Sequence, residues 1–255
     1  MTQKLFANVW AFAAAVLAAV ATAAAQPAPA RVAGIPRMPD GKPNFTGVWA
    51  GPAFTHLVGP DDTDTPRVTN FDRSKMAPFV PGAEKRFLQP PTGDPRHDDP
   101  TELCLPDGHP REALAPYAQQ VVQTPDTVVF LYEYMHFFRV VPIGKPHPKD
   151  VELTFMGNSV AQWEGDTLVI DTIGLREWTL SASNGWHSDA LHTIERIRHT
   201  DAATLSYEIT VDDPKIFTRT WSQEFQMKLH PTWSLLEQIC EENNRCQGGN
   251  CTPSK

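Results

Sequence analysis

His136 and Tyr134 stand two residues apart in an aromatic segment, where a β-strand would turn both side chains to one face. A histidine in an aromatic-lined cavity can act as a general acid or base, with a pKa set by burial and partners. The alternative is a structural histidine that is hydrogen-bonded to a neighbouring strand. We interpret His136 and Tyr134 as candidates for moving a proton.

Glu195 alternates with Thr193 and Ile197 along a predicted strand. If that face points inward, the carboxyl group is buried, and burial raises its pKa into the range useful for acid/base catalysis. The alternative is an ion pair with Arg139 or Arg219 that braces the structure. Glu195 is the second candidate for proton transfer.

His187 lies in a predicted loop, 181–190, directly after Trp186. Loops that carry histidine, aspartate and tryptophan at the rim of a barrel commonly supply binding groups. A serine-nucleophile triad is not supported, because the chain has no Gly-x-Ser-x-Gly turn. His187 and His192 could bind a metal, but their spacing imposes no defined ligand geometry, so we expect none. His187 is instead a third candidate for proton transfer.

Arginine and aromatic side chains are the candidates for ligand binding. Arg139 or Arg219 would hold an oxyanion that develops during a reaction. Tyr132, Trp163 and Trp221 lie in predicted strands, where aromatic side chains usually pack in the core. They would line a ligand only in a hollow barrel.

Several cofactor-binding patterns are missing from the chain. It has no glycine-rich phosphate loop, no dinucleotide fingerprint, no His-Glu-x-x-His and no Cys-x-x-Cys-His. An enzyme with this sequence would work without a cofactor. The net charge of −8 and the lack of a lysine/arginine cluster argue against nucleic-acid binding. The expected ligand is a small apolar or aromatic molecule.

The elements that must position these residues are predicted to be β-strands. Runs rich in β-branched and aromatic residues recur about every 10 residues, which is typical of antiparallel sandwiches and barrels. Along 127–142 neither face is purely apolar, which favours a barrel with a partly polar, ligand-sized interior. The predicted strands are 44–49, 121–123, 127–142, 151–156, 159–164, 167–173, 191–199, 204–211, 216–228 and 232–240.

Residues 1–25 have the pattern of a cleavable signal peptide: a positive charge at Lys4, an apolar stretch and three small residues at 23–25. An uncleaved anchor would need about 20 strongly apolar residues, whereas this stretch is mostly alanine. We expect a periplasmic or secreted protein with no stable membrane insertion after cleavage.

The mature chain is predicted to be one domain. A segment rich in proline and alanine, 26–44, precedes a barrel domain at 45–240, and a cysteine-containing tail follows at 241–255. Residues 51–110 are dense in proline, which excludes central strands and helix interiors. We expect this part to form a long ordered wrap over the barrel.

The four cysteines, Cys104, Cys240, Cys246 and Cys251, indicate disulfides, because export leads to an oxidising compartment. Three connectivities are possible. We favour Cys104–Cys240 with Cys246–Cys251, since the first bond would tie the proline-rich segment to the last predicted strand. A zinc site is less favoured, because no Cys-x-x-Cys pair is present.

Several sequence motifs resemble those of known protein families. Gly47-Val48-Trp49 resembles the Gly-x-Trp opening of lipocalin-like (calycin-type) barrels. Over nearly the whole mature chain, the sequence resembles a large family of exported bacterial β proteins, most of them described only as hypothetical. This resemblance implies a shared β fold and supports pairing Cys104 with Cys240, but it carries no reaction. The motifs are PRMPDGKPNFTGVW at 36–49, WEGDTLV at 163–169, HSDAL at 187–191, ER at 195–196, DPK at 213–215, TRTW at 218–221 and CEENN at 240–244.

Three functions remain open from the sequence. The first is a cofactor-independent acid/base enzyme of lyase or isomerase type, including carbon–carbon lyases, or a hydrolase. The second is a lipocalin-like protein that binds or transports a small hydrophobic ligand. The third is a structural module whose proline-rich arm docks a partner. Convergence of His, Glu and Tyr inside the barrel would favour catalysis.

Overall fold

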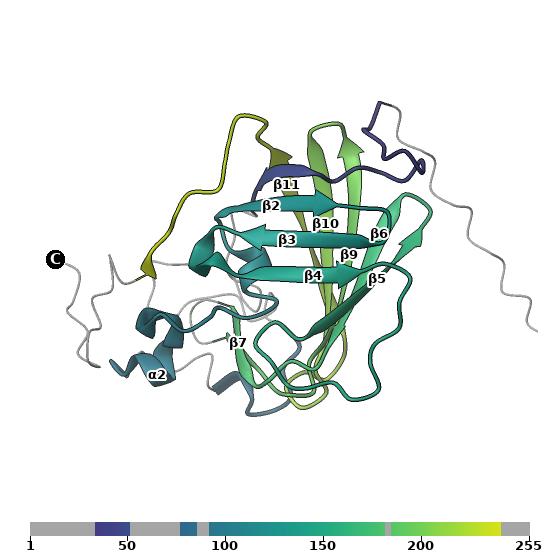
Figure 1. Ribbon diagram of the computed structural model, residues 1–255. Coiled ribbons are helices and arrows are strands. Elements are labelled where there is room, and N and C mark those ends of the chain that lie inside the picture. The colour runs from purple at the N-terminus through teal and green to yellow at the C-terminus, as the bar shows by residue number, and fades with distance from the viewer. Residues whose placement is uncertain (1–33, 52–76, 86–91, 182–184, 241–255) are drawn as a thin grey trace, which may run out of the picture.

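The computed structural model describes residues 34–51, 77–85, 92–181 and 185–240 (Figure 1). Short helical turns are found at α2 (Pro95–Asp98), η2 (Pro100–Leu103), η3 (Glu112–Leu114) and η4 (Tyr134–His136). The strands are β1 (Gly47–Ala50), β2 (Ala118–Gln123), β3 (Thr127–Tyr132), β4 (Phe138–Pro142), β5 (Asn158–Glu164), β6 (Thr167–Ile173), β7 (Trp178–Ser181), β8 (Gly185–His187), β9 (His192–Asp201), β10 (Thr204–Asp212) and β11 (Trp221–Leu229).

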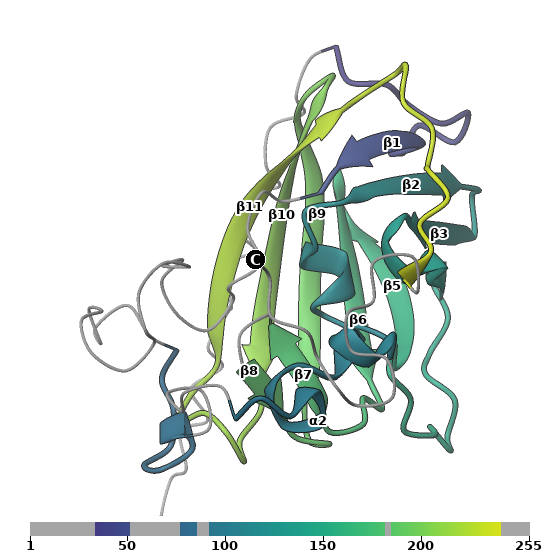
Figure 2. The same ribbon diagram turned by 90° about the vertical axis from the view of Figure 1, so that its left-hand side faces the viewer.

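Nine of these strands form one sheet that curls into a barrel (Figure 1, Figure 2). Their order is β4–β3–β2–β1–β11–β10–β9–β6–β5, and every ladder between neighbours is antiparallel. The two edges meet just after β4, where Ile143 bridges Ala161 and the Gly144 amide donates to the Ala161 carbonyl at 2.7 Å. The sheet is therefore a nearly closed, lipocalin-like β-barrel, which confirms the predicted fold class.

One end of the barrel is filled with aromatic side chains. Trp49 and Phe45 are buried, and the Trp49 indole donates to the Phe45 carbonyl at 2.8 Å. The His199 ring lies 5.2 Å from the Phe45 ring and 5.8 Å from Trp49, between ring centroids. The tryptophan of the Gly-x-Trp opening therefore closes this end.

Polar side chains are buried farther along the interior. β9 turns Thr193, Glu195 and Ile197 inward, and β10 adds Tyr207 and Ile209, because alternate residues of a strand share a face. Residues on the opposite faces of these strands are mostly half-exposed. The mixed inner face agrees with the polar interior expected from the sequence.

The predicted strand 127–142 is wrong, because a turn divides it into β3 and β4. Met135 and His136 adopt left-handed backbone conformations (φ 54° and 55°). Neither is a glycine or an asparagine, the residues that commonly indicate such a turn in a sequence. The turn is supported from far along the chain: Met135 N–H donates to the Gln238 side chain, and Gln238 N–H donates to Nε2 of His136, both at 2.9 Å.

Three further strand predictions need correction. Residues 151–156 contribute only an isolated bridge between Thr154 and Leu175. The strand expected at 216–228 begins at Trp221, since 216–218 bonds to the proline-rich segment instead, with a bridge between Phe79 and Phe217. Residues 232–240 form no strand; they descend past the ends of β1, β2 and β3 (Figure 2).

A disulfide between Cys104 and Cys240 joins the proline-rich segment to this C-terminal segment, with sulfur atoms 2.11 Å apart. This confirms the favoured first pairing. Cys246 and Cys251, the predicted signal peptide at 1–25 and much of the predicted wrap at 51–110 lie outside the described residues. In the described part of the chain, no helix has the length and apolarity needed to cross a membrane.

Candidate functional site

Arg139 and Glu195 form an ion pair inside the barrel. Nη1 and Nη2 of Arg139 lie 2.6 and 2.8 Å from Oε2 and Oε1 of Glu195. Burial alone would raise the pKa of Glu195, but attraction to Arg139 and His109, with hydrogen bonds from Arg139 and Tyr207, holds it below its ordinary value. The raised pKa expected from the sequence is therefore wrong. The alternative of an ion pair with Arg139 is correct.

The sheet register brings the two side chains together. Arg139 on β4 is paired with Phe130 on β3, while Glu195 on β9 is paired with Ile170 on β6 and Ile209 on β10. β4 and β9 lie on opposite walls of the curled sheet (Figure 1). The side chains of Arg139 and Glu195 therefore meet across the interior.

His109 joins this pair from the end of the proline-rich segment. Its Nδ1 accepts a hydrogen bond from Nη1 of Arg139 at 3.0 Å, since a guanidinium can only donate. The proton is therefore on Nε2, which lies 2.9 Å from the Thr193 hydroxyl and 3.7 Å from Oε2 of Glu195. Burial lowers the pKa of His109 to about 3 despite the attraction of Glu195. The imidazole is neutral at physiological pH.

Close packing explains how His109 reaches the interior. Gly108 has φ 75°, and a Cβ there would lie 2.9 Å from the Trp178 ring and 3.1 Å from the Phe155 carbonyl. The His109 amide donates to that same carbonyl at 2.8 Å. A larger residue at 108 would push the segment away from the barrel.

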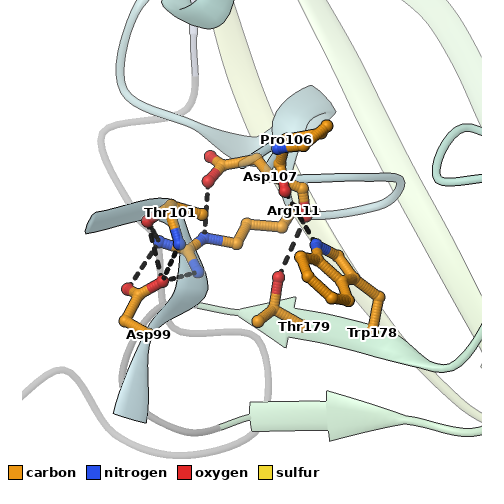
Figure 3. Close-up of polar contacts among 7 residues, drawn as sticks. All are labelled: Asp99, Thr101, Pro106, Asp107, Arg111, Trp178 and Thr179. Atoms are coloured by element: carbon orange, nitrogen blue, oxygen red, sulfur yellow. Dashed lines mark hydrogen bonds and ion pairs between the residues drawn. The ribbon is translucent and has the colours of Figure 1, made fainter. Parts of the chain in front are cut away.

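Arg111 anchors the same segment to its neighbours (Figure 3). Its guanidinium donates to both oxygens of Asp99, at 2.8 and 2.9 Å, and its Nε lies 3.1 Å from Oδ1 of Asp107. Burial raises the pKa of Asp107 to about 6, although attraction to Arg111 opposes the shift. The cation is thus shared between two largely buried carboxyl groups.

β7 supplies the second half of this anchor (Figure 3). The Trp178 indole donates to the Pro106 carbonyl at 2.7 Å, and the Thr179 hydroxyl donates to the Asp107 carbonyl at 3.0 Å. Together with Arg111, these bonds fix the segment that carries His109.

Glu112 directly follows Arg111 in the chain and is buried, with 1% of its surface exposed. Burial raises the pKa of Glu112 to about 9; repulsion from Asp107 adds to the shift and attraction to Arg111 opposes it. The group is a neutral carboxylic acid at physiological pH. Neither oxygen has a hydrogen-bond partner among the described residues.

His187 lies on β8 and not in a loop, and it is buried. Its Nδ1–H donates to the Ser188 carbonyl at 2.9 Å, which leaves Nε2 as an acceptor without a described partner. Burial lowers the pKa of His187 to about 4, against the effect of that hydrogen bond. The Ser188 amide and hydroxyl both bond to Asp213 at 2.7 Å, and this holds the position of β8.

Tyr132 completes the group of buried polar residues. The Tyr132 hydroxyl is near enough to Arg139 and Glu112 to interact with them electrostatically. His187 interacts with His109 in the same way. Within the described chain, however, the Tyr132 hydroxyl and Nε of Arg139 lack a hydrogen bond of good geometry. We call these residues the interior polar cluster: His109, Glu112, Tyr132, Arg139, His187, Glu195 and Tyr207.

The structure places four of the sequence candidates in this cluster, namely Glu195, His187, Arg139 and Tyr132. Trp221 is also buried, and its ring contacts Phe217 edge-on at 5.3 Å.

The other four candidates lie elsewhere. His136 is exposed on the turn after β3, so the aromatic strand face predicted for it is wrong. Tyr134, on the same turn, is half-buried and stacks on Tyr117 at 4.6 Å. Arg219 is exposed before β11, because that strand starts later than predicted. Trp163 stacks on Phe45 at the aromatic end, 5.7 Å between centroids.

Sequence reasoning missed His109, Glu112 and Tyr207. Tyr207 alternates with Leu205 and Ile209 in a strand that was predicted, so its inward direction could have been found. His109 and Glu112 carry no such signal, since they follow the proline-rich segment and reach the interior only through tertiary packing.

Hollows lined by described residues are found outside the interior polar cluster. One, of about 630 Å³, lies over the outer faces of β5, β6 and β9 and is lined by Lys145, His147 and Asp171 among others. Another, of about 430 Å³, lies between the C-terminal segment and the start of β2, with Tyr117 and Trp233 in its wall. No three described His, Cys, Asp or Glu side chains are grouped to hold a metal ion.

Comparisons of the chain with protein-family models, curated proteins and solved structures find no match. The fold and the site therefore define the protein: an antiparallel β-barrel with an ion pair, two neutral histidines and a neutral carboxylic acid buried in its interior.

Proposed function

We propose that the protein is an acid/base enzyme of lyase or isomerase type that acts, without a cofactor, on a small apolar or aromatic molecule bound at the interior polar cluster. The observation that carries this proposal is the set of buried polar atoms without described partners: Nε2 of His187, the Glu112 carboxyl, the Tyr132 hydroxyl and Nε of Arg139. Buried polar groups are nearly always hydrogen-bonded, so such a group indicates a missing partner or a reactive role.

The protonation states give these groups complementary tasks. His187 is neutral and its Nε2 lone pair is free, so it can accept a proton from a bound molecule. Glu112 is neutral and carries a proton that it can donate. Two titratable groups whose environments move their pKa values apart are typical of an acid and a base in one site.

The Arg139–Glu195 pair would act as a positioning element. Glu195 is held by Arg139 and Tyr207, and His109 is held by Arg139 and Thr193, so neither is free to exchange protons readily. Their role would be to fix the guanidinium beside the ligand.

A test of this function does not require the substrate to be known. The purified protein is incubated in D₂O with a small-molecule extract of its native host, and mass spectrometry records compounds that gain deuterium or change mass. Acid/base turnover predicts such compounds with the wild type, and predicts their loss with His187→Gln and Glu112→Gln. The exposed matched controls, His97→Gln and Glu237→Gln, should behave as the wild type. Equal labelling by all five proteins would contradict the proposal.

A second candidate is a lipocalin-like protein that binds or transports a small hydrophobic ligand. The mutual hydrogen bonds of Arg139, Glu195 and His109 favour it, since a satisfied polar network adds rigidity rather than reactivity. In that case the same extract would yield a molecule that co-purifies with the protein, with no isotope exchange.

Export to the periplasm or the medium is part of the proposal. It is supported by the signal-like residues 1–25 and by the Cys104–Cys240 disulfide, which is typical of an oxidising compartment. The mature protein from its native host should begin near Gln26 by terminal mass spectrometry. A chain that retains residues 1–25 would contradict cleavage.

A further inference from the structure

Two donor groups in the interior polar cluster lack an acceptor. Nη1 of Arg139 donates to Glu195 and His109, and Nη2 donates to Glu195. The Nε–H of Arg139 has no described partner. The Tyr132 hydroxyl lies beside the same guanidinium, which can only donate to it, so the hydroxyl's own proton has no described acceptor. Both residues are at least 95% buried (Tyr132 3% and Arg139 4% exposed), so bulk water cannot serve as the partner.

The acceptors that Arg139 and Tyr207 contact are already in use. The two Glu195 oxygens accept from Arg139 and Tyr207, and Nδ1 of His109 accepts from Arg139. The other acceptors of the cluster, Nε2 of His187 and the Glu112 oxygens, form no described hydrogen bond with Tyr132 or with Nε of Arg139, so these two donors still lack an acceptor. A buried donor without an acceptor is destabilising, so a partner that brings an acceptor binds with a gain in affinity.

We infer that the ligand presents a neutral carbonyl oxygen to the Tyr132 hydroxyl and Nε of Arg139. This inference rests on the proposed function, because it names the chemical class of the molecule bound at that site. A carbonyl oxygen has two lone pairs and no hydrogen, so one atom satisfies both donors.

The charge balance of the site favours a neutral carbonyl group over a carboxylate as the ligand. The cation of Arg139 is balanced by the buried anion of Glu195, and a second carboxylate would be desolvated beside that anion. A ketone or aldehyde enters without this penalty. If Nε2 of His187 takes a proton from the carbon next to the carbonyl, the C–H electron pair forms a C=C bond and the C=O π pair moves to the oxygen. The resulting enolate oxygen lies against the same two donors.

The test uses three probes of similar size: acetophenone, ethylbenzene and benzoate. Binding to the mature wild-type protein is measured by titration calorimetry at pH 7. We expect acetophenone to bind at least tenfold more tightly than ethylbenzene, which lacks the oxygen, and than benzoate, which carries a charge. Equal affinity for acetophenone and ethylbenzene, or no binding of acetophenone, would overturn the inference.

Tyr132→Phe tests which residue is responsible. This variant removes a hydroxyl whose proton has no described acceptor, so it should fold with a stability close to that of the wild type. We expect it to lose about tenfold in affinity for acetophenone and nothing for ethylbenzene, whereas Tyr117→Phe, a change in the outer hollow, should alter neither. An unchanged affinity of Tyr132→Phe for acetophenone would contradict the assignment.

The same probe distinguishes the inference from the proposed function. Acetophenone has exchangeable methyl protons beside its carbonyl, and NMR in D₂O follows their exchange. Tight, Tyr132-dependent binding without catalysed exchange would support the carbonyl site and contradict acid/base turnover of this probe. Exchange that continues unchanged in Tyr132→Phe would support turnover and contradict the carbonyl site.

Discussion

Arg139 and Glu195 are 56 residues apart in the chain and meet in a two-point ion pair in the barrel interior, with 3% and 0% of their side chains exposed. Such a pair is costly to break, because removal of one partner leaves the other charge buried and uncompensated. It also fixes the guanidinium to which His109 is hydrogen-bonded.

Replacement of Arg139 by Met should therefore lower the free energy of unfolding by about 3–5 kcal/mol, as measured by denaturant unfolding. The double variant Arg139→Met/Glu195→Leu should recover part of this loss, since it buries no charge. Arg198→Met is the matched control: Arg198 is paired with Glu224 on the outer surface, where a pair contributes at most about 1 kcal/mol. A loss for Arg139→Met no greater than for Arg198→Met would contradict this account.

Glu112 should make the protein less stable as the pH rises. Its pKa is about 9 in the folded protein against an ordinary value of 4.5, so the folded state retains a proton that the unfolded state releases between these values. Glu112→Gln removes this penalty. Its unfolding free energy should exceed that of the wild type by about 3 kcal/mol at pH 7, and by little at pH 4.5. A difference that does not change with pH would refute the assignment of a neutral Glu112.

His187 should have the opposite effect on stability. Its pKa is about 4 in the folded protein against 6.5, so the unfolded state takes up a proton first as the pH falls. Between pH 6.5 and 4 this costs about 3 kcal/mol, which His187→Gln should remove. Thermal unfolding of both proteins across this range measures the effect. Parallel curves for the variant and the wild type would show that His187 is not a buried neutral group.

His136 should contribute to structure and not to ligand binding. It accepts the Gln238 amide at 2.9 Å and so holds the C-terminal segment on the turn after β3. His136→Ala should cost about 1 kcal/mol or less and speed hydrogen exchange at the Gln238 amide. Its affinity for acetophenone should equal that of the wild type. A loss of affinity for acetophenone without faster hydrogen exchange at the Gln238 amide would show that His136 takes part in ligand binding.

Strand positions could be predicted where the local pattern decides them. β5, β6, β9 and β10 follow alternating β-branched residues, and their observed bounds lie within three residues of the predicted ones. Glu195 and Arg139 were found for the same reason, because a charge on an inward-facing strand position is visible in the sequence.

The remaining errors come from long-range contacts. The turn at Met135 and His136 depends on Gln238, about one hundred residues away, so its own residues give no turn signal. His109 reaches the interior through Gly108, which fits tightly against Trp178 and Phe155. Single-sequence patterns report local preferences and do not contain such contacts.

We expect small molecules to bind at the interior polar cluster and not in an outer hollow. The most direct test is an NMR titration of the protein, carrying ¹³C-labelled Tyr and His rings, with acetophenone. The account predicts that the largest saturable shifts occur at Tyr132 and His187, with signals assigned by Tyr132→Phe and His187→Gln. Shifts confined to Tyr117, in the hollow beside Trp233, would contradict it.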